Sequence, residues 1–186
     1  YMKTALITGG AQRIGAQIAQ TLHSNGYNVI IHYRHSKQAA KTLAQTLNTQ
    51  RSDSATIVQA ELSNLDDIQA LSHHIERLDV LVNNASVFYP TAVEEVNQDA
   101  WNNIMNTNLM APFFLSQSLT AALKKTSGCI INIVDIHGER PLKNHAIYNI
   151  SKAGVAMMTK TLAKELAPEI RVCGVSPGSI LWPENE

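Results

Sequence analysis

The sequence predicts an α/β fold in which a doubly wound parallel sheet of six strands carries helices on both faces. Short β-branched runs alternate along the chain with longer segments whose apolar residues recur at helical spacing. The strand-like runs are apolar along their whole length, which is typical of strands covered on both sides. With 186 residues, 45% of them hydrophobic, the chain can bury one good core. We therefore expect a single domain over residues 1–186.

Each element follows from its local pattern. Six runs rich in valine and isoleucine are expected to form the strands, over residues 4–8, 27–33, 55–62, 79–85, 129–135 and 170–176. The segments between them place apolar residues three and four positions apart, which is the period of an amphipathic helix. These helices are expected over residues 14–26, 38–50, 65–78, 101–125 and 146–167.

Charge and cysteine usage narrow the class of partner and the compartment. Fifteen basic residues balance fifteen acidic ones, so we expect no nucleic-acid or membrane-surface partner. The expected partners are small molecules. No apolar run reaches the roughly 20 residues of a membrane span, and no signal-peptide pattern opens the chain. Cys129 and Cys173 lie inside apolar strand-like runs, which favours buried thiols in a reducing compartment. We expect a cytoplasmic protein.

The first predicted strand leads directly into the segment TGGAQRIG, residues 8–15, and a helix begins at its end. Gly9, Gly10 and Gly15 would let backbone N–H groups and the helix N-terminus contact a pyrophosphate. Glycines at such a junction also serve tight packing alone, and the turn by itself leaves that alternative open. Its place at the N-terminus favours a dinucleotide-binding turn of the Rossmann type.

The second predicted strand ends in the segment IIHYRHS, with Arg34 and no carboxylate. Domains selective for NAD usually carry an acid there that holds the ribose hydroxyls. Arg34 and Ser36 instead suit a 2′-phosphate, so NADP(H) is the expected cofactor. The alternative for Arg34 is an ordinary solvated loop cation.

Tyr148 and Lys152 stand four residues apart in a predicted helix, so both project from one face. A phenol is a poor acid-base group at neutral pH, and a neighbouring ammonium would lower its pKa by favouring phenolate. A tyrosine and a lysine at this spacing are common in helices and carry little information by themselves. The pair becomes a specific signal of a dinucleotide-dependent enzyme when it occurs with the glycine-rich turn, with NNAS after the fourth strand and with PGS after the sixth.

With these motifs in this order, the sequence resembles the short-chain dehydrogenase/reductase family: Thr8 to Gly15, Asn83 to Ser86, Asn108, Tyr148, Lys152, and Pro177 with Gly178. The resemblance implies that Tyr148 is the proton donor, that Lys152 lowers its pKa and holds the nicotinamide ribose, and that Asn108 supports a water relay. It assigns the cofactor to residues of these motifs and of the loops after the second and third strands: Gly9, Arg13, Ile14, Gly15, Tyr33, Arg34, His35, Ser36, Glu61, Leu62, Asn84, Ala85, Ser86, Tyr148, Lys152, Pro177, Gly178 and Ser179. Glu61 stands where the family commonly has an aspartate near the adenine.

Two departures from the family pattern are informative. Arg13 replaces the middle glycine of the usual turn, and Asp135 replaces the serine that normally polarises a carbonyl. Together with HYRHS and NNASVFYPT, they resemble the pteridine reductase and dihydromonapterin reductase branch. The resemblance implies an NADPH-dependent reduction of a dihydropterin, dihydrobiopterin, dihydromonapterin or dihydrofolate.

The chemistry makes an acid at position 135 intelligible, because a pterin offers ring C=N bonds and an amino-pyrimidine edge. Asp135 can accept hydrogen bonds from that edge and, with Tyr148, help protonate a ring nitrogen. Phe88 would stack on the flat ring, and Ser86 and Arg13 would reach its polar atoms or the cofactor phosphates. For Phe88 taken alone, core packing is the alternative.

Other readings stay open. The protein could be a carbonyl or sugar reductase of the same family, or an NADP-binding protein without turnover.

The histidines outside the motifs are not expected to form a site. His73 and His74 lack partners at ligand spacing, so we expect surface positions and no metal site. His137 and His145 are expected to face solvent. The resemblance also implies a homo-oligomer, a tetramer or dimer, and a further strand after PGSILWPENE that this chain lacks.

Overall fold

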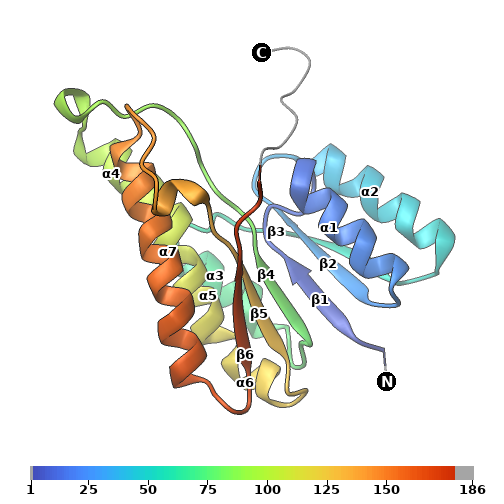
Figure 1. The fold of residues 1–186 in the computed structure, drawn as a ribbon. Coiled ribbons are helices and arrows are strands. Elements are labelled where there is room, and N and C mark those ends of the chain that lie inside the picture. Colours follow the sequence, from blue (N-terminus) through green and yellow to red (C-terminus); the bar gives the residue numbers. More distant parts are fainter. Residues whose placement is uncertain (1, 179–186) are drawn as a thin grey trace.

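The predicted fold class is confirmed by a computed structural model, which describes residues 2–178. All neighbouring strands are parallel, in the order β3-β2-β1-β4-β5-β6 (Figure 1). The strands are β1 (Thr4–Ile7), β2 (Asn28–Tyr33), β3 (Ala55–Gln59), β4 (Val80–Asn83), β5 (Cys129–Ile133) and β6 (Arg171–Val175). The order reverses between β1 and β4, and a ligand crevice is expected at such a switch point.

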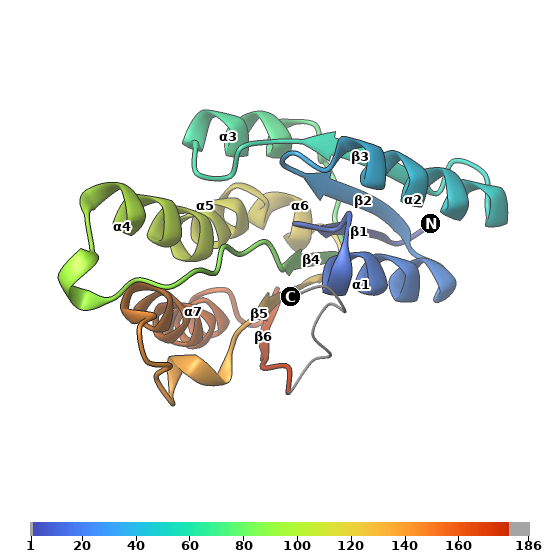
Figure 2. The ribbon, with the colours of Figure 1, turned by 90° about the horizontal axis from the view of Figure 1, so that it is seen from above.

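Helices cover both faces of the sheet (Figures 1 and 2). One face carries α1 (Arg13–Ser24) and α2 (Lys37–Gln50), and the other carries α3 (Leu65–His73), α5 (Ala111–Ser118), α6 (Thr120–Lys124) and α7 (Ala146–Glu165). Shorter elements complete the chain: α4 (Gln98–Met105), the 3-10 turns η1 (Val93–Glu95) and η3 (Ile136–Gly138), and the π-helical turn η2 (Asn106–Met110).

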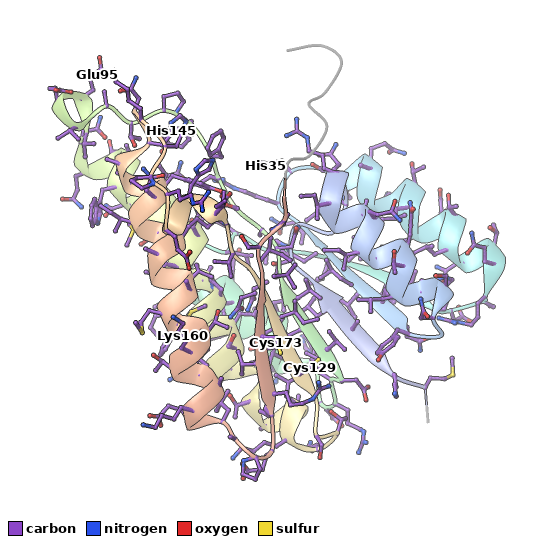
Figure 3. The ribbon with its side chains drawn as sticks, in the orientation of Figure 1. His35, Glu95, Cys129, His145, Lys160 and Cys173 are labelled. Carbon is purple, nitrogen blue, oxygen red and sulfur yellow. The ribbon has the colours of Figure 1, made fainter. Side chains whose placement is uncertain are left out.

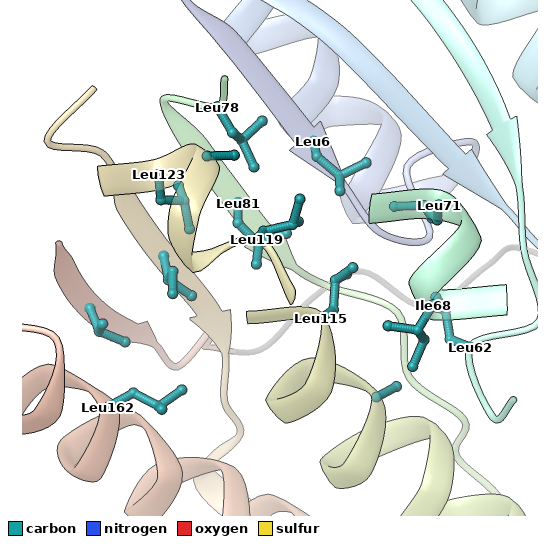
Figure 4. Close-up of a cluster of buried hydrophobic side chains, with 14 of the residues drawn as sticks. Leu6, Leu62, Ile68, Leu71, Leu78, Leu81, Leu115, Leu119, Leu123 and Leu162 are labelled. Carbon is teal, nitrogen blue, oxygen red and sulfur yellow. The ribbon is translucent and has the colours of Figure 1, made fainter. Parts of the chain in front are cut away.

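Two hydrophobic cores explain why the strands are apolar along their whole length. In β1, Leu6 belongs to the core under α3, α5 and α7, whereas Ala5 and Ile7 belong to the core under α1 and α2. Successive side chains of a strand point to opposite faces, so both sets must be apolar. Figure 4 shows the first core, in which Leu81 and Leu115 are fully buried.

The helical stretch predicted over residues 101–125 is present, but it is broken into α4, η2, α5 and α6. The π-helical turn Asn106–Met110 widens the backbone, and Pro112 follows in the first turn of α5. Leu119 then leaves helical geometry, with φ −93° and ψ 1°. Apolar periodicity continues through these breaks, so it could not reveal them.

The prediction of two buried thiols is also wrong. Cys129 is half-buried and Cys173 is exposed, and both are unpaired. Figure 3 shows Cys173 on β6, the last strand of the described sheet. The face of β6 opposite α7 has no covering helix among residues 2–178, so an apolar run there does not guarantee burial. His73 and His74 are exposed, as predicted.

No helix within residues 2–178 has the length and apolar character needed to cross a membrane.

Candidate active site

The glycine-rich turn after β1 has the geometry that a pyrophosphate requires. Gly9 has φ 58°, a left-handed conformation that favours glycine. A Cβ on Gly15 would lie 2.1 Å from the carbonyl oxygen of Gly9, so only glycine lets α1 begin this close to the turn. The N-cap residue Gln12 makes no side-chain bond to the first turn of α1. These residues fit the diphosphate of a dinucleotide, which the N-terminal end of a helix attracts.

The segment after β4 braces this turn. The backbone amides of Asn84 and Ala85 donate to Thr8 Oγ1 at 2.9 and 3.0 Å. Asn84 Nδ2 donates to the carbonyls of Thr8 and Gly9 at 2.9 and 3.2 Å. Asn84 and Ala85, predicted to contact the cofactor, therefore also fix the shape of the turn that would hold it.

Arg34 is not the plain solvated cation that one alternative suggested. Its Nε pairs with Glu61 Oε2 from the loop after β3. Glu61 also accepts from the backbone amide and hydroxyl of Ser63, at 3.2 and 2.8 Å. Burial raises the pKa of the Glu61 carboxyl, but the hydrogen bonds from Ser63 and the charge of Arg34 outweigh it and hold that pKa below its usual value. Within residues 2–178 the terminal guanidinium nitrogens have no hydrogen-bond or ion-pair partner, so they can bind a phosphate.

The loop residues around Arg34 divide between the surface and the core. His35 is exposed (Figure 3), and the Ser36 hydroxyl donates to Gln12 Oε1 at 3.1 Å. Tyr33 and Leu62, both predicted cofactor contacts, are 8% and 5% exposed and pack into the two cores. Their side chains therefore serve core packing, and their contacts with a cofactor stay predictions.

Asp135 and Tyr148, separated by thirteen residues in the sequence, meet directly. Tyr148 Oη donates to Asp135 Oδ2 at 2.6 Å, and Asp135 Oδ1 accepts from the backbone amide of His137 at 2.9 Å. Asp135 follows β5 and caps η3, whereas Tyr148 lies in the first turn of α7. An acid in place of the family serine is therefore bonded to the expected proton donor.

Lys152 lies close to Tyr148. It is 5% exposed, its Nζ donates to the carbonyl of Ile133 at 3.1 Å, and it stands 5.6 Å from the Tyr148 ring centroid. Burial lowers the pKa of the Lys152 ammonium, and the charge of Asp135 partly restores it. The ammonium thus faces the aromatic ring and leaves the phenol oxygen to Asp135.

The structure corrects the predicted pKa of the phenol. Burial first, then the hydrogen bond to Asp135 and its negative charge, raise the pKa of Tyr148 above its ordinary value. Burial disfavours the charged phenolate, and a carboxylate that accepts a hydrogen bond from the phenol stabilises the neutral form further. Tyr148 is therefore held as a protonated donor.

Asn108 lies in the π-helical turn η2 and is 3% exposed. Its Oδ1 accepts from the Val87 amide at 2.8 Å, and its Nδ2 donates to the Val87 carbonyl at 3.0 Å and Ser151 Oγ at 3.2 Å. It therefore ties the loop after β4 to α7. The water relay stays a prediction, because this geometry shows a brace.

Phe88 is half exposed, at 50%, so the core-packing alternative is wrong. Its ring stacks on His145 with centroids 4.6 Å apart and an interplanar angle of 15°. It also meets the Tyr148 ring edge-on at 4.8 Å. An exposed aromatic face beside the phenol is suited to a flat heterocycle.

His145, which the sequence interpretation left out, belongs to this aromatic group (Figure 3). It is the N-cap residue of α7, and its Nδ1 lies 2.8 Å from the Lys143 carbonyl, to which it can donate. Its spacing of three residues from Tyr148, one turn of the same helix, is the signal that could have found it. A second missed residue is His32, whose imidazole contacts Gly9.

Among residues 2–178, the remaining predicted residues have no side-chain hydrogen bond or ion pair. Arg13 and Ser86 are exposed, Arg13 with φ 50°, and Ile14 lies in the first turn of α1. Pro177 and Gly178 follow the carboxyl end of β6, and Ser179 lies outside the described residues. Across residues 2–178, no group of three or more histidine, cysteine or acidic residues could hold a metal ion.

A braced diphosphate turn beside an acid, a phenol and an ammonium defines a dinucleotide-binding oxidoreductase. The chain belongs to the short-chain dehydrogenase/reductase family, since the family model described as short chain dehydrogenase matches residues 3–185.

The relatives include two kinds of reductase. Pteridine reductase 1 of Leishmania tarentolae is 36% identical over 224 aligned positions, which cover 97% of this chain and 78% of that protein. The 3-oxoacyl-(acyl-carrier-protein) reductase FabG of Staphylococcus aureus is 35% identical, with 96% and 75% covered. An uncharacterized oxidoreductase of Staphylococcus epidermidis is 32% identical, with 99% and 80% covered. Oxidoreductase membership is common to all three, whereas the substrate differs or is unassigned.

Proposed function

We propose that this protein is an NADPH-dependent reductase of pterins, converting a dihydropterin, dihydrobiopterin, dihydromonapterin or dihydrofolate to its tetrahydro form. The observation that carries the proposal is the 2.6 Å hydrogen bond from Tyr148 to Asp135. An acid at that position suits the amino-pyrimidine edge of a pterin, and the similarity to a pteridine reductase supports the same substrate class.

Residues of this chain orient the pterin and donate the proton. Phe88 and His145 offer the stacking surface, and Asp135 orients the ring through its amino and N–H groups. When bound, NADPH supplies the hydride that reduces the C=N bond. Tyr148 donates the proton to the ring nitrogen, and the buried ammonium of Lys152 favours the phenolate that remains.

The direct test is an assay of NADPH oxidation by the purified protein. The panel contains dihydrobiopterin, dihydromonapterin, dihydrofolate, simple ketones and a 3-oxoacyl thioester. We expect kcat/KM for at least one pterin or folate to exceed that for every carbonyl substrate. A preference for the thioester or a ketone would establish the alternative, a carbonyl reductase. Binding of NADPH without turnover of any substrate would indicate a non-catalytic NADP-binding protein.

NADP(H) selectivity is proposed on Arg34. Arg34→Ala should raise the Kd for NADPH roughly tenfold or more, since a charge-assisted hydrogen bond contributes about 1.5–3 kcal/mol. The Kd for NADH should stay within about twofold, because NADH lacks the 2′-phosphate. Fluorescence titration of both cofactors measures this. Lys41→Ala, which removes an exposed cation of α2 outside the predicted site, is the matched control and should leave the Kd for NADPH unchanged. Equal Kd values for NADPH and NADH in the wild type would contradict the assignment.

A homo-oligomer, dimer or tetramer, is also proposed. An apolar groove of about 430 Å³ runs over α4, η2, α5 and α7, and is lined by Met105, Asn106, Leu109, Met110, Phe113, Phe114, Met157, Met158 and Thr161. Met157 and Phe113 are 61% and 38% exposed. A second copy of the same apolar face is the occupant that the family resemblance favours.

A cytoplasmic location is also proposed. The two unpaired cysteines support it, because free thiols are typical of a reducing compartment.

Met157→Glu tests the subunit interface. Burying a carboxylate against a second apolar face is costly, so the variant should dissociate to monomers at concentrations where the wild type is assembled. Sedimentation velocity measures the mass of both. Lys160→Glu, a change of charge on the same helix outside the residues that line the groove, is the control and should leave the assembly intact. An unchanged mass for Met157→Glu would refute the placement of the interface.

A further inference from the structure

His32 makes contacts that neither the motifs nor the proposed chemistry explains. It lies in β2 and is 2% exposed. Its Nδ1 lies 3.0 Å from the backbone amide of Gly9, and its Nε2 lies 3.1 Å from the carbonyl oxygen of Ala60. Its own carbonyl accepts from the amide of Gly10 at 2.9 Å. One residue therefore holds two consecutive glycines of the diphosphate turn.

These partners fix the form of the imidazole. A backbone amide can only donate, so Nδ1 must carry a free lone pair. A carbonyl can only accept, so Nε2 must carry the hydrogen. The neutral Nε2–H tautomer is the one form that satisfies both bonds. Burial lowers the pKa of His32, an effect that the Ala60 bond and the charge of Glu61 only partly offset, which agrees with a neutral ring.

The two bonds join the halves of a dinucleotide site. Gly9 begins the turn that fits the diphosphate, with φ 58°. Ala60 immediately precedes Glu61, which pairs with Arg34, the proposed contact of the 2′-phosphate. The imidazole thus spans from the turn after β1 to the loop after β3, across the strand between them. Displacing either end would move one binding element relative to the other.

We infer that His32 is a positioning residue for the dinucleotide, which holds the Gly9 amide and the Ala60 loop in register for a diphosphate and an adenosine 2′-phosphate. The inference rests on the proposed use of NADP(H) and goes beyond it, because His32 acts through Gly9 and Ala60 without touching the reacting groups. Loss of its bonds should weaken cofactor binding and leave the chemical step largely intact.

Three variants separate the two bonds. His32→Phe keeps a flat ring and removes both. His32→Asn places an amide oxygen near the position of Nδ1, where it can accept from Gly9, but cannot reach Ala60. His32→Gln places an amide NH₂ near the position of Nε2, where it can donate to Ala60, but leaves the Gly9 amide without an acceptor.

Titration of the full chain with NADPH and with 2′,5′-ADP gives the first readout. We expect His32→Phe to raise the Kd for NADPH at least tenfold, His32→Gln to behave similarly, and His32→Asn to stay within about threefold of the wild type. Steady-state kinetics gives the second readout: KM for NADPH should rise with Kd, while kcat at saturating NADPH falls by no more than about twofold. Because 2′,5′-ADP lacks the diphosphate bridge, its Kd should change less than that of NADPH.

His23→Phe is the matched control. His23 is also a buried histidine, 3% exposed, whose Nε2 lies 2.7 Å from Ser54 Oγ, away from the turn. The His23→Phe variant should have a lower melting temperature than the wild type and an unchanged Kd for NADPH. If His23→Phe raised that Kd as much as His32→Phe, or if all three His32 variants bound like the wild type, the positioning role would be wrong. If His32→Phe does not fold, the contrast between Asn and Gln decides, and equal affinity of those two overturns the inference. Failure of the wild type to bind either dinucleotide would instead refute the proposed cofactor and the inference together.

Discussion

Tyr148→Phe is expected to reduce turnover of the best substrate by roughly 10²–10⁴-fold, the usual contribution of a general acid. The phenol donates to Asp135 at 2.6 Å, and its raised pKa holds the proton in place until a substrate nitrogen accepts it. The variant keeps the ring, and with it the edge contact to Phe88. NADPH affinity should therefore stay within about twofold, as measured by titration alongside kcat.

Lys152→Ala is the informative companion to this variant. Lys152 is buried between the Ile133 carbonyl and the Tyr148 ring, so its loss should weaken both NADPH binding and turnover. Wild-type turnover by Tyr148→Phe would show that the proton comes from another group.

Asp135→Ser should cut pterin turnover at least tenfold while ketone reduction holds or rises. The exchange restores the hydroxyl found in carbonyl-reducing relatives and removes charge-assisted hydrogen bonds worth about 1.5–3 kcal/mol each. In this structure Asp135 has two roles, because Oδ2 accepts from Tyr148 and Oδ1 caps the amide of His137. Both activities and the melting temperature should be measured on the same protein.

Asp135→Asn separates these roles. An asparagine keeps an oxygen for the His137 amide and removes the charge, so the melting temperature should change little. The pKa of Tyr148 should fall toward its ordinary value, since the negative charge beside the phenol is one cause of its elevation. A spectroscopic titration of the tyrosines detects that shift. An unchanged ratio of pterin to ketone activity in Asp135→Ser would refute the proposal that Asp135 binds a pterin. Asp135 would then have only the role of capping the His137 amide.

Some of the site was predictable because it is local. The turn from Thr8 to Gly15 needs glycine wherever a Cβ would strike backbone, so it can be identified from its letters. Tyr148 and Lys152 share a helix face by spacing alone. The absence of an acid after β2 could be seen directly, and so could Asp135 in place of serine. None of these required knowledge of which strands are neighbours.

The contacts that define the candidate chemistry were not local. Tyr148 to Asp135, Arg34 to Glu61, and His32 to Gly9 and Ala60 each join different strand ends. One expectation failed for this reason: burial, together with the hydrogen bond and negative charge of Asp135 from another loop, raises the pKa of the Tyr148 phenol. The core-packing alternative for Phe88 failed as well, because half of that side chain is exposed and its ring neighbours are His145 and Tyr148.

The sequence by itself therefore determined the parallel sheet, the diphosphate turn and the tyrosine–lysine pair, because each depends on residues close together along the chain. Only the tertiary structure decided which acid meets the phenol, which carboxylate holds Arg34 and which histidine fixes the turn. The strand order 3-2-1-4-5-6 brings the carboxyl ends of six strands to one edge. Which side chains touch there depends on loops that no short-range pattern encodes.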